Sequence, residues 1–290
     1  MTSVLIFGLA NSMGLALLAI GFSFVFGISG IANFAYGALY VVGGCIVYIA
    51  LNSMGLPYWA AVLVALVILF IAGAIIYRIG IQRVRGAMLS EVIVTMGIGI
   101  AIIEAVRWTG FGASRQTYLP SFVTGGLTIE DIGVEYQRIF IIGIGLILFL
   151  LLWVFTRYTK LGLAFRAMSQ DELTALSLGL DNDRLALLSM GVGAMLAVIA
   201  AVAIVPLGFL SVEVGYDVLI FALAVGVLGG LGSTLGIITG AFVLGYAQSL
   251  ASTYLGPQWM MVVTFLAIVL VLLIKPSGIF GKEKELEERV

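Results

Sequence analysis

The chain has 290 residues, of which 62% are hydrophobic and 10% are charged, and its formal net charge is −1. Soluble domains have about 25% charged residues, so this composition excludes a soluble globular protein and predicts a protein that crosses a lipid bilayer several times. The balanced charge offers no basic surface for nucleic acid. The absence of histidine excludes histidine-based zinc sites, general bases and proton relays, and no metal site is expected.

The apolar residues gather in nine segments that are candidates for membrane-spanning helices, which need about 20 residues each. The second and seventh candidates are short or interrupted by glycine, and they adjoin the uncharged linkers Gly27–Gly30 and Gly229–Gly236. We therefore predict an all-α integral membrane protein, a polytopic bundle of eight or nine transmembrane helices. The candidate segments are residues 4–27, 31–51, 58–78, 89–109, 138–156, 185–207, 217–232, 235–252 and 258–274.

The basic residues predict the orientation of the chain, because cytoplasmic loops carry an excess of lysine and arginine. With nine spans, only Arg107, Arg115 and Arg138 fall on one side. The other side should face the cytoplasm. This places the C-terminus and the charged tail at residues 282–290 on the cytoplasmic side of the inner (plasma) membrane. The eleven basic residues on that side are Arg78, Arg83, Arg85, Arg157, Lys160, Arg166, Arg184, Lys275, Lys282, Lys284 and Arg289.

One stretch between the apolar segments, residues 159–184, is too polar to lie in hydrocarbon and should form a cytoplasmic loop with a short surface helix. Ser169 and Glu172 have the spacing of a capping box, which predicts a helix from Ser169 to about residue 178, and Gly179 suits its C-terminal stop. The charged residues of this stretch are Lys160, Arg166, Asp171, Glu172, Asp181, Asp183 and Arg184.

Leu173, Leu176 and Leu180 recur on one face of this predicted helix. Such a face fits a groove on a partner protein, but it is also typical of an amphipathic helix lying on lipid headgroups. The residues alone leave both interpretations open. The polar residues that could make contacts around this face are Arg166, Gln170, Asp171 and Glu172.

The sequence predicts one sizeable external loop, at residues 110–137. The pair Gly125–Gly126 lies there between short β-prone runs at 118–123 and 127–129, which predicts a hairpin. This hairpin is either a docking surface for an external partner or a plain connection.

Polar residues inside apolar segments are candidates for a substrate path. Asn33, Tyr36 and Gly37 begin the second span beside a glycine-rich linker, where a broken helix would expose backbone groups that can bind a zwitterion. Asn11 and Gln248 are further candidates. The alternative for these side chains is a hydrogen bond between helices, worth about 0.6 kcal/mol on average.

Glu104 and Arg107 lie near the outer end of the fourth span at i, i+3 spacing. A lone charge at the bilayer centre costs about 2.5–3.5 kcal/mol, and pairing on one helix face relieves part of that cost. Glu104 is therefore a candidate for lining an outer vestibule. The alternative is that both residues snorkel to the interface beside Trp108.

Small residues surround the second glycine-rich linker. The spacing of Gly226, Gly230, Gly236 and Gly240 is typical of closely packed membrane helices. The same closeness would allow helices to slide during gating, and the two roles are compatible. The residues assigned to packing and gating are Gly226, Gly229, Gly230, Gly232, Gly236 and Gly240.

Four stretches together resemble one family, the permeases of branched-chain amino-acid ABC importers, and specifically the LivH-like subunit. They are Asn33-Phe34-Ala35-Tyr36-Gly37, Gly162 to Asp171, Val227 to Ser233, and Lys275 to Gly281. The resemblance covers nearly the whole chain and rests on the order and spacing of the stretches. The family usually has histidine where this chain has Tyr36, which leaves the particular substrate open.

This resemblance implies a type II importer-like permease over residues 1–281, with transport and not catalysis as its task. Its partners would be a second related (LivM-like) permease or a second copy, two cytoplasmic ABC ATPases and a periplasmic substrate-binding protein. ATP and magnesium would bind in the ATPase, so no cofactor is expected in this chain. The resemblance assigns the polar stretch to ATPase coupling, through Arg166, Ser169, Gln170, Asp171, Glu172, Leu173, Ala175, Leu176 and Gly179.

Other classes of function fit the sequence less well. The chain has no G-x-x-x-x-G-K-[ST] phosphate loop, so it is not itself an ATPase. An intramembrane enzyme would need a nucleophile elbow, histidine or a cluster of acidic metal ligands. An ion-coupled secondary transporter or channel is the main alternative, but no acidic residue lies in the middle of an apolar segment.

Overall fold

The computed structural model describes residues 2–110, 117–123, 125–129 and 132–281. Within these ranges a helix covers each of the nine apolar segments, which confirms the predicted all-α fold class. The nine helices are α1 (Thr2–Ser29), α2 (Tyr36–Asn52), α3 (Tyr58–Ile79), α4 (Met88–Trp108), α5 (Tyr136–Tyr158), α8 (Asn182–Ile204), α9 (Val214–Gly229), α10 (Thr234–Tyr254) and α11 (Trp259–Ile274).

Six of these helices are long and apolar enough to cross a membrane, namely α1, α3, α4, α5, α8 and α10. The helices α2, α9 and α11 are shorter. The predicted second span begins five residues too early, because residues 30–35 are not helical and Gly30 has a φ of +69°. The helix α11 ends at Ile274, since Pro276 cannot continue a helix.

The described parts of the connections contain four short helices and one hairpin. The short helices are η1 (Ile81–Arg83), α6 (Lys160–Gln170), α7 (Glu172–Ser177) and η2 (Val205–Leu207). In the hairpin, β1 (Gly126–Ile129) pairs antiparallel with β2 (Ile132–Glu135).

The predicted hairpin is wrong in its position along the chain. Gly125 precedes the first strand and does not form the turn between strands, and residues 118–123 do not pair with 127–129. The preceding segment instead bridges to another loop, because Thr117 pairs with Leu210 after η2.

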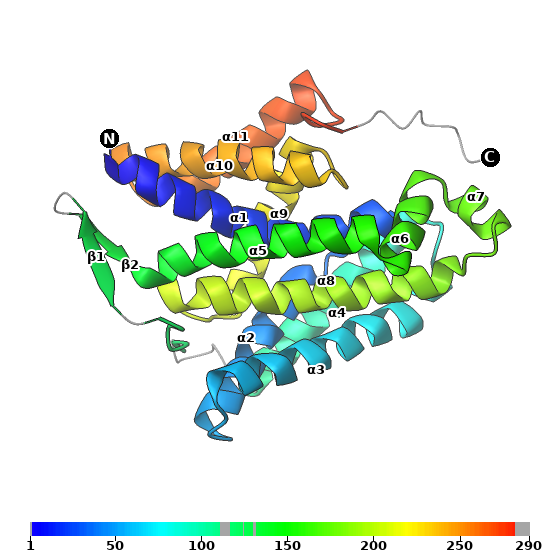
Figure 1. Cartoon of the computed structure of the whole chain (residues 1–290), viewed down its shortest axis with the longest axis horizontal. Helices are drawn as coiled ribbons and strands as arrows, with labels where there is room; N and C mark the ends of the chain where they lie inside the picture. Colours follow the sequence, from blue (N-terminus) through cyan, green and yellow to red (C-terminus); the bar gives the residue numbers. More distant parts are fainter. Residues whose placement is uncertain (1, 111–116, 124, 130–131, 282–290) are drawn as a thin grey trace.

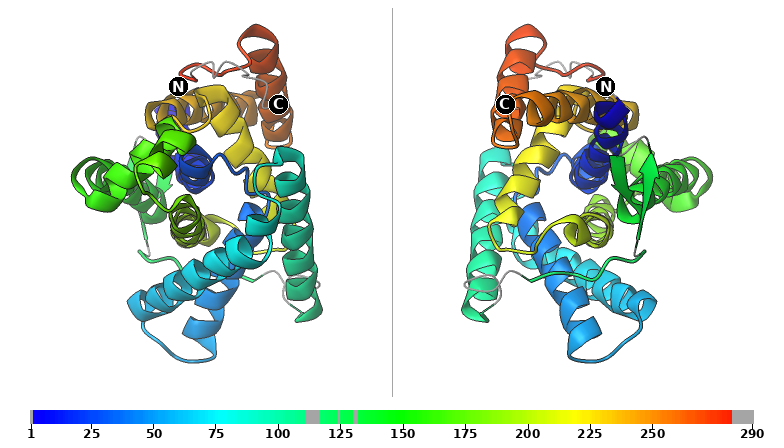
Figure 2. Two further views of the ribbon diagram at one scale, coloured as in Figure 1. Left: turned by 90° about the vertical axis from the view of Figure 1, so that its right-hand side faces the viewer. Right: turned by 90° about the vertical axis from the view of Figure 1, so that its left-hand side faces the viewer.

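The helices α1 and α8 form the centre of the bundle. Most residues of each helix are buried, and the two helices pack on each other. The helices α9 and α10 also pack against α1, and the helices α2 and α3 pack against α8. The helices α3, α4 and α5 lie at the periphery, and most of their residues are at least partly exposed (Figure 2). Their exposed side chains are mainly leucine, isoleucine and valine, which suits contact with lipid.

The bundle has two distinct ends (Figure 1). The helices α6 and α7 lie at one end, together with the turn from α3 to α4, and the β-hairpin lies at the opposite end. We call these the α7 end and the hairpin end. Because α5 runs from the hairpin to α6, the basic residues Arg157, Lys160 and Arg166 all lie at the α7 end.

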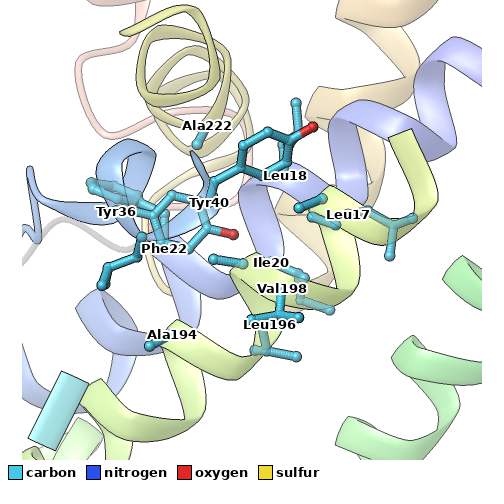
Figure 3. Close-up of a cluster of buried hydrophobic side chains, with 14 of the residues drawn as sticks. Leu17, Leu18, Ile20, Phe22, Tyr36, Tyr40, Ala194, Leu196, Val198 and Ala222 are labelled. Atoms are coloured by element: carbon cyan, nitrogen blue, oxygen red, sulfur yellow. The ribbon is translucent and has the colours of Figure 1, made fainter. Parts of the chain in front are cut away.

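The core is dense beside the interruption between α1 and α2. Tyr36 and Tyr40 of α2 are fully buried among side chains of α1 and α8 (Figure 3). The ring of Phe22 meets that of Tyr36 edge to face, with centroids 6.2 Å apart. Gly21 is required here, because a Cβ at this position would meet the Tyr36 ring at 2.7 Å.

Candidate functional site

The polar stretch of residues 159–184 folds into α6 and α7 at the α7 end. Thr159 caps α6 by accepting a hydrogen bond from the Gly162 N–H at 2.9 Å. The apolar face of α6 is anchored in the core, where the Phe165 ring meets Phe24 of α1 at a centroid distance of 5.8 Å. This anchor fixes the position from which α7 begins.

The cap of α7 is Asp171, so the predicted capping box at Ser169 is wrong. The Asp171 carboxylate accepts hydrogen bonds from the N–H groups of Leu173 (2.9 Å) and Thr174 (3.1 Å). A further hydrogen bond from the Thr174 hydroxyl is the main reason that the pKa of Asp171 is lowered. Ser169 lies in the last turn of α6, where its hydroxyl donates to the Arg166 carbonyl.

The end of α7 has the hydrogen bonds of a Schellman motif. Gly179 adopts a φ of +84°, its N–H donates to the Leu176 carbonyl, and the Leu180 N–H donates to the Ala175 carbonyl. The helix ends at Ser177, and Gly179 stops it as the sequence predicts.

The outer surface of α7 is apolar and unpartnered within the described chain. The side chains of Leu173 and Leu176 are 76% and 57% exposed, whereas Ala175 is buried beneath them. Leu180 does not belong to this face, because it packs against the core. Arg166, Gln170 and Asp171 are exposed around these leucines, so the structure brings most of the predicted coupling residues together.

A partly buried arginine that the sequence did not single out ties α7 to the bundle. Arg85, in the turn between α3 and α4, directs Nη2 to the Glu172 carboxylate of α7 and Nη1 to Asp183 of α8, the latter at 2.6 Å. Its side chain is only 15% exposed. From the sequence it counts only as one basic residue of a loop, because its partners lie 87 and 98 residues away.

Further hydrogen bonds complete this network. The Tyr77 hydroxyl donates to Asp183 at 2.7 Å and accepts from Arg85 at 2.9 Å, and Gln82 donates to the second Asp183 oxygen at 3.1 Å. The Asn182 side-chain amide donates to the Glu172 carbonyl at 2.8 Å. The beginning of α7 is therefore held by α8 through both side chains and backbone.

The second group of predicted residues lies at the interruption between α1 and α2, residues 30–35, which we call the helix break. Asn33 stabilises the break through its backbone carbonyl and side-chain oxygen, which accept from the N–H groups of Tyr36 and Ala35. From α4, the Thr95 hydroxyl accepts a hydrogen bond from the Phe34 N–H at 3.2 Å. A broken helix in the bundle thus has its backbone satisfied by a neighbouring helix.

Two polar atoms at the helix break are buried without a hydrogen-bond partner in the described chain. They are Nδ2 of Asn33 and the hydroxyl oxygen of Tyr36. Gly37 lies directly against the backbone of Gly215 in α9, with no room for a Cβ. The structure therefore gathers the path candidates Asn33, Tyr36 and Gly37 in one place.

Asn11 and Gln248 lie elsewhere and bond to each other. The Asn11 amide donates to Gln248 at 3.0 Å, and Gln248 donates to the Thr264 hydroxyl at 2.7 Å. Asn11 is 18 residues before the end of α1, so about 27 Å of helix separates it from the helix break. These hydrogen bonds join α1, α10 and α11 and favour a packing role for both residues.

Glu104 lies near the hairpin end of α4 and pairs with Arg107 at 2.7 Å, as their spacing predicts. Arg107 also approaches Glu213, before α9, at 3.4 Å. All three side chains are at least one-third exposed. The pair is thus separate from the helix break, and the vestibule role of Glu104 stays a prediction.

The helices α9 and α10 approach each other through glycine. A Cβ on Gly229 would collide with the backbone of Gly236, and a Cβ on Gly240 would come within 2.8 Å of the Val225 carbonyl oxygen. Gly226 faces the side chain of Leu231. These positions have no room for larger residues, whereas their gating role stays a prediction.

The linker after α9 also contacts α1 and the chain after α11. Gly232 has a φ of +83° and lies against Gly27 of α1, while Gly230 has a φ of +97° and lies against Gly281. The N–H groups of Ile279 and Phe280 donate to the last carbonyls of α9, at 2.9 and 3.0 Å. The segment 275–281 therefore caps α9.

The described ranges contain no group of three or more histidine, cysteine, aspartate or glutamate side chains that could hold a metal ion. The two groups of predicted residues lie on a helix surface at one end and at a helix break inside the bundle.

Comparison with known proteins agrees with this geometry. The family profile "Branched-chain amino acid transport system / permease component" matches residues 4–272. The chain is 32% identical to the high-affinity branched-chain amino acid transport system permease protein BraD of Pseudomonas aeruginosa, over 96% of this chain and 95% of that protein. It is 33% identical to the permease protein LivH of Escherichia coli, over 92% and 91%.

More distant matches extend the comparison. The chain is 28% identical to the permease protein LivM of Salmonella typhimurium, over 91% of this chain and 67% of that protein. The solved structure of PsaBC from Streptococcus pneumoniae in complex with Fab matches with a TM-score of 0.52 and 14% identity, over 96% and 94% of the two chains. At that identity the match shows a shared fold alone. The profile match over residues 4–272 and the two relatives above 30% identity show that this chain belongs to the permease components of branched-chain amino acid transport systems.

Proposed function

We propose that this chain is a permease subunit of an ABC importer that carries branched-chain amino acids across the inner membrane. The family and its relatives' names support the substrate class. The single structural observation that carries the coupling role is α7, a capped helix that presents Leu173 and Leu176 to solvent at the basic end of the bundle. Such an apolar face, backed by fixed anchors, suits the groove of a soluble partner.

The α7 end is the cytoplasmic side in this proposal. The described basic residues at that end outnumber those at the hairpin end, where Arg107 and Arg138 lie. The positive-inside rule then places α7 where two ATPases can reach it. The hairpin end faces outward, toward a periplasmic substrate-binding protein.

A second permease completes the pore in this proposal. The chain matches both LivH and LivM relatives across more than nine-tenths of its length, so two related permeases can adopt one fold and pack side by side. A LivM-like partner is the first candidate and a second copy of this chain is the other. ATP and magnesium belong to the partner ATPases.

The helix break is the proposed substrate contact. Its unpartnered polar atoms, Nδ2 of Asn33 and the hydroxyl of Tyr36, can hydrogen-bond a zwitterion once neighbouring helices separate. ATP-driven closure of the ATPases would move α7, rearrange the helices around Asn33 and Gly229, and open this place to one side at a time. Transport then needs no chemistry by this chain.

Co-purification tests the proposal most directly. The tagged chain, extracted from its native membrane in mild detergent, should bring along an ATPase with a phosphate-loop motif and support ATP-dependent leucine uptake in vesicles. Replacing both Leu173 and Leu176 with aspartate should release the ATPase. Leu255→Asp is a matched control, because Leu255 is equally exposed but lies after α10 at the hairpin end.

Two outcomes would contradict the proposal. A wild-type chain that purifies without an ATPase and still transports leucine in nucleotide-free vesicles would be a secondary carrier. An ATPase that stays bound to the double leucine variant would show that α7 is not the docking surface.

A further inference from the structure

The turn between α3 and α4 connects the α7 surface to the helix break. Its partly buried Arg85 holds Glu172 of α7, and three residues later the chain enters α4 at Met88. The next contact lies at the beginning of α4, where the buried Glu91 carboxylate accepts a hydrogen bond from the Gly86 N–H at 2.8 Å. This bond fixes the turn to the first residues of the helix.

One turn further along α4, Thr95 reaches the helix break. Its hydroxyl lies 2.9 Å from the Glu91 carbonyl and 3.2 Å from the Phe34 N–H. The next turn of α4 adds Gly99, which lies against Ala35 so closely that a Cβ there would approach its Cα at 3.0 Å. From Arg85 to Phe34, the route therefore consists of adjacent residues of the turn and a series of hydrogen bonds between buried or half-buried groups.

The helix α4 has little else to hold it within the described chain. Most of its residues are at least partly exposed, and its main packing contacts are with α2 and η1. Toward the hairpin end, Ile103 forms a small apolar cluster with Ala38 and Val212 that is separate from the main core. A helix with so few anchors can shift as a unit when the turn at its beginning is displaced.

We propose that Arg85 is a positioning residue that transmits movement of α7 to α4, and through Thr95 to the helix break. This proposal rests on the proposed function, because it requires an ATPase that moves α7. The guanidinium is suited to the task, since its planar fork holds two carboxylates from two helices at once.

A purely structural role makes a different prediction. If Arg85 only anchored α8 through Asp183, its loss would lower the stability of the chain, and ATP hydrolysis and uptake would fall together. If it transmits movement, its loss should leave the ATPase bound and active while transport fails. The ratio of ATP hydrolysed to leucine imported separates these two cases.

The experiment uses the complete importer reconstituted in proteoliposomes with its ATPases and binding protein, and leucine as the probe. In Arg85→Gln, ATP hydrolysed per leucine should rise at least about fivefold, which is the lower end of the usual coupling between two sites. Arg85→Lys keeps the charge and should recover part of the wild-type ratio. Arg83→Gln removes the same charge from an exposed position two residues away and should leave the ratio unchanged.

The double variant with Thr95→Val tests the second half of the route. If Arg85 and Thr95 act in series, this variant should have the same ratio as Arg85→Gln alone. Ratios that multiply would overturn the step through Thr95. If Arg85→Gln does not fold, Glu172→Gln removes only the α7 arm of the network and should raise the ratio as well.

A wild-type ratio in the folded Arg85→Gln and Glu172→Gln variants would overturn the proposal. Failure of the proposed function is visible separately, in the wild-type complex before any substitution, as leucine uptake that does not consume ATP.

Discussion

At the scale of single residues, the helix break depends on one hydroxyl from a neighbouring helix. Thr95 is fully buried, and its hydroxyl oxygen accepts a hydrogen bond from the Phe34 N–H, which lies outside any helix. An unpaired buried N–H costs about 1–3 kcal/mol, so this contact matters more than an ordinary side-chain hydrogen bond. The free hydroxyl and amide nearby, on Tyr36 and Asn33, are then the polar groups left for a substrate.

Thr95→Val keeps the shape of the side chain and removes the hydroxyl. We expect the free energy of unfolding to fall by about 1–3 kcal/mol, because the Phe34 N–H loses its acceptor. Thermal unfolding of the purified protein, followed by intrinsic fluorescence, measures this change. Thr239→Val is the control, since that hydroxyl bonds only to carbonyls of its own helix. Equal melting temperatures for the two variants would contradict the role of Thr95.

The sequence identified the polar residues of the site better than their partners. Asn33 and Tyr36 could be selected because they are polar groups beside a glycine linker in an apolar region. The pairing of Asn11 with Gln248, and of Arg85 with Glu172, could not be predicted, because 237 and 87 residues separate the partners. Such pairs are set by helix packing and not by local pattern.

At the scale of elements, the beginning of α7 shows how packing decides between two possible caps. Both Ser169 and Asp171 precede residues that could form a helix. The buried Phe165 and Met168 keep α6 helical up to Gln170, so Ser169 is already inside a helix. Asp171 is extended, with a φ of −153°, and becomes the cap. The stop at Gly179 was predictable, because a positive φ is a local property of glycine.

Asp171→Ala should therefore loosen α7, whereas Ser169→Ala should not. Loss of an N-cap costs about 1 kcal/mol of helix stability, which corresponds to roughly a fivefold faster hydrogen exchange. Hydrogen–deuterium exchange of the amides at residues 173–178 measures this directly. Faster exchange in Ser169→Ala than in Asp171→Ala would restore the capping box as the better description.

The contact between α9 and α10 makes a second prediction at this scale. In Gly229→Ala or Gly236→Ala the new methyl group has no space, so the helices must separate, at a cost of about 1–3 kcal/mol or more. We expect little monodisperse protein by size-exclusion chromatography in detergent. Gly97→Ala is the matched control, because Gly97 lies in α4 with nothing within 4 Å of its added Cβ. Normal yields from the α9–α10 variants would show that the interface is loose.

At the scale of the whole molecule, the apolar segments predicted how many long helices the bundle contains, whereas the orientation inferred from the basic residues stays a prediction. Nine helices could be counted from the apolar segments alone, because the backbone N–H and C=O groups of a segment in lipid must hydrogen-bond within that segment, as they do in a helix. Their lengths were harder to predict: α2, α9 and α11 are shorter than the six helices that are long and apolar enough to cross a membrane. Two of these three, α2 and α9, are shortened where glycine interrupts the helix, at the helix break and at the α9–α10 linker.

The hairpin end and the α7 end of the bundle should face opposite sides of the membrane, and impermeant labelling can test this. Ser53→Cys lies in the exposed turn after α2 at the hairpin end, and Ser177→Cys lies at the exposed end of α7. A membrane-impermeant maleimide should label Ser53→Cys in intact cells and Ser177→Cys only after permeabilisation, because the positive-inside rule predicts that the basic α7 end faces the cytoplasm. The native Cys45 is buried and should give little background. Labelling of both cysteines in intact cells would mean that the two ends share one side, and α7 could then not reach an ATPase.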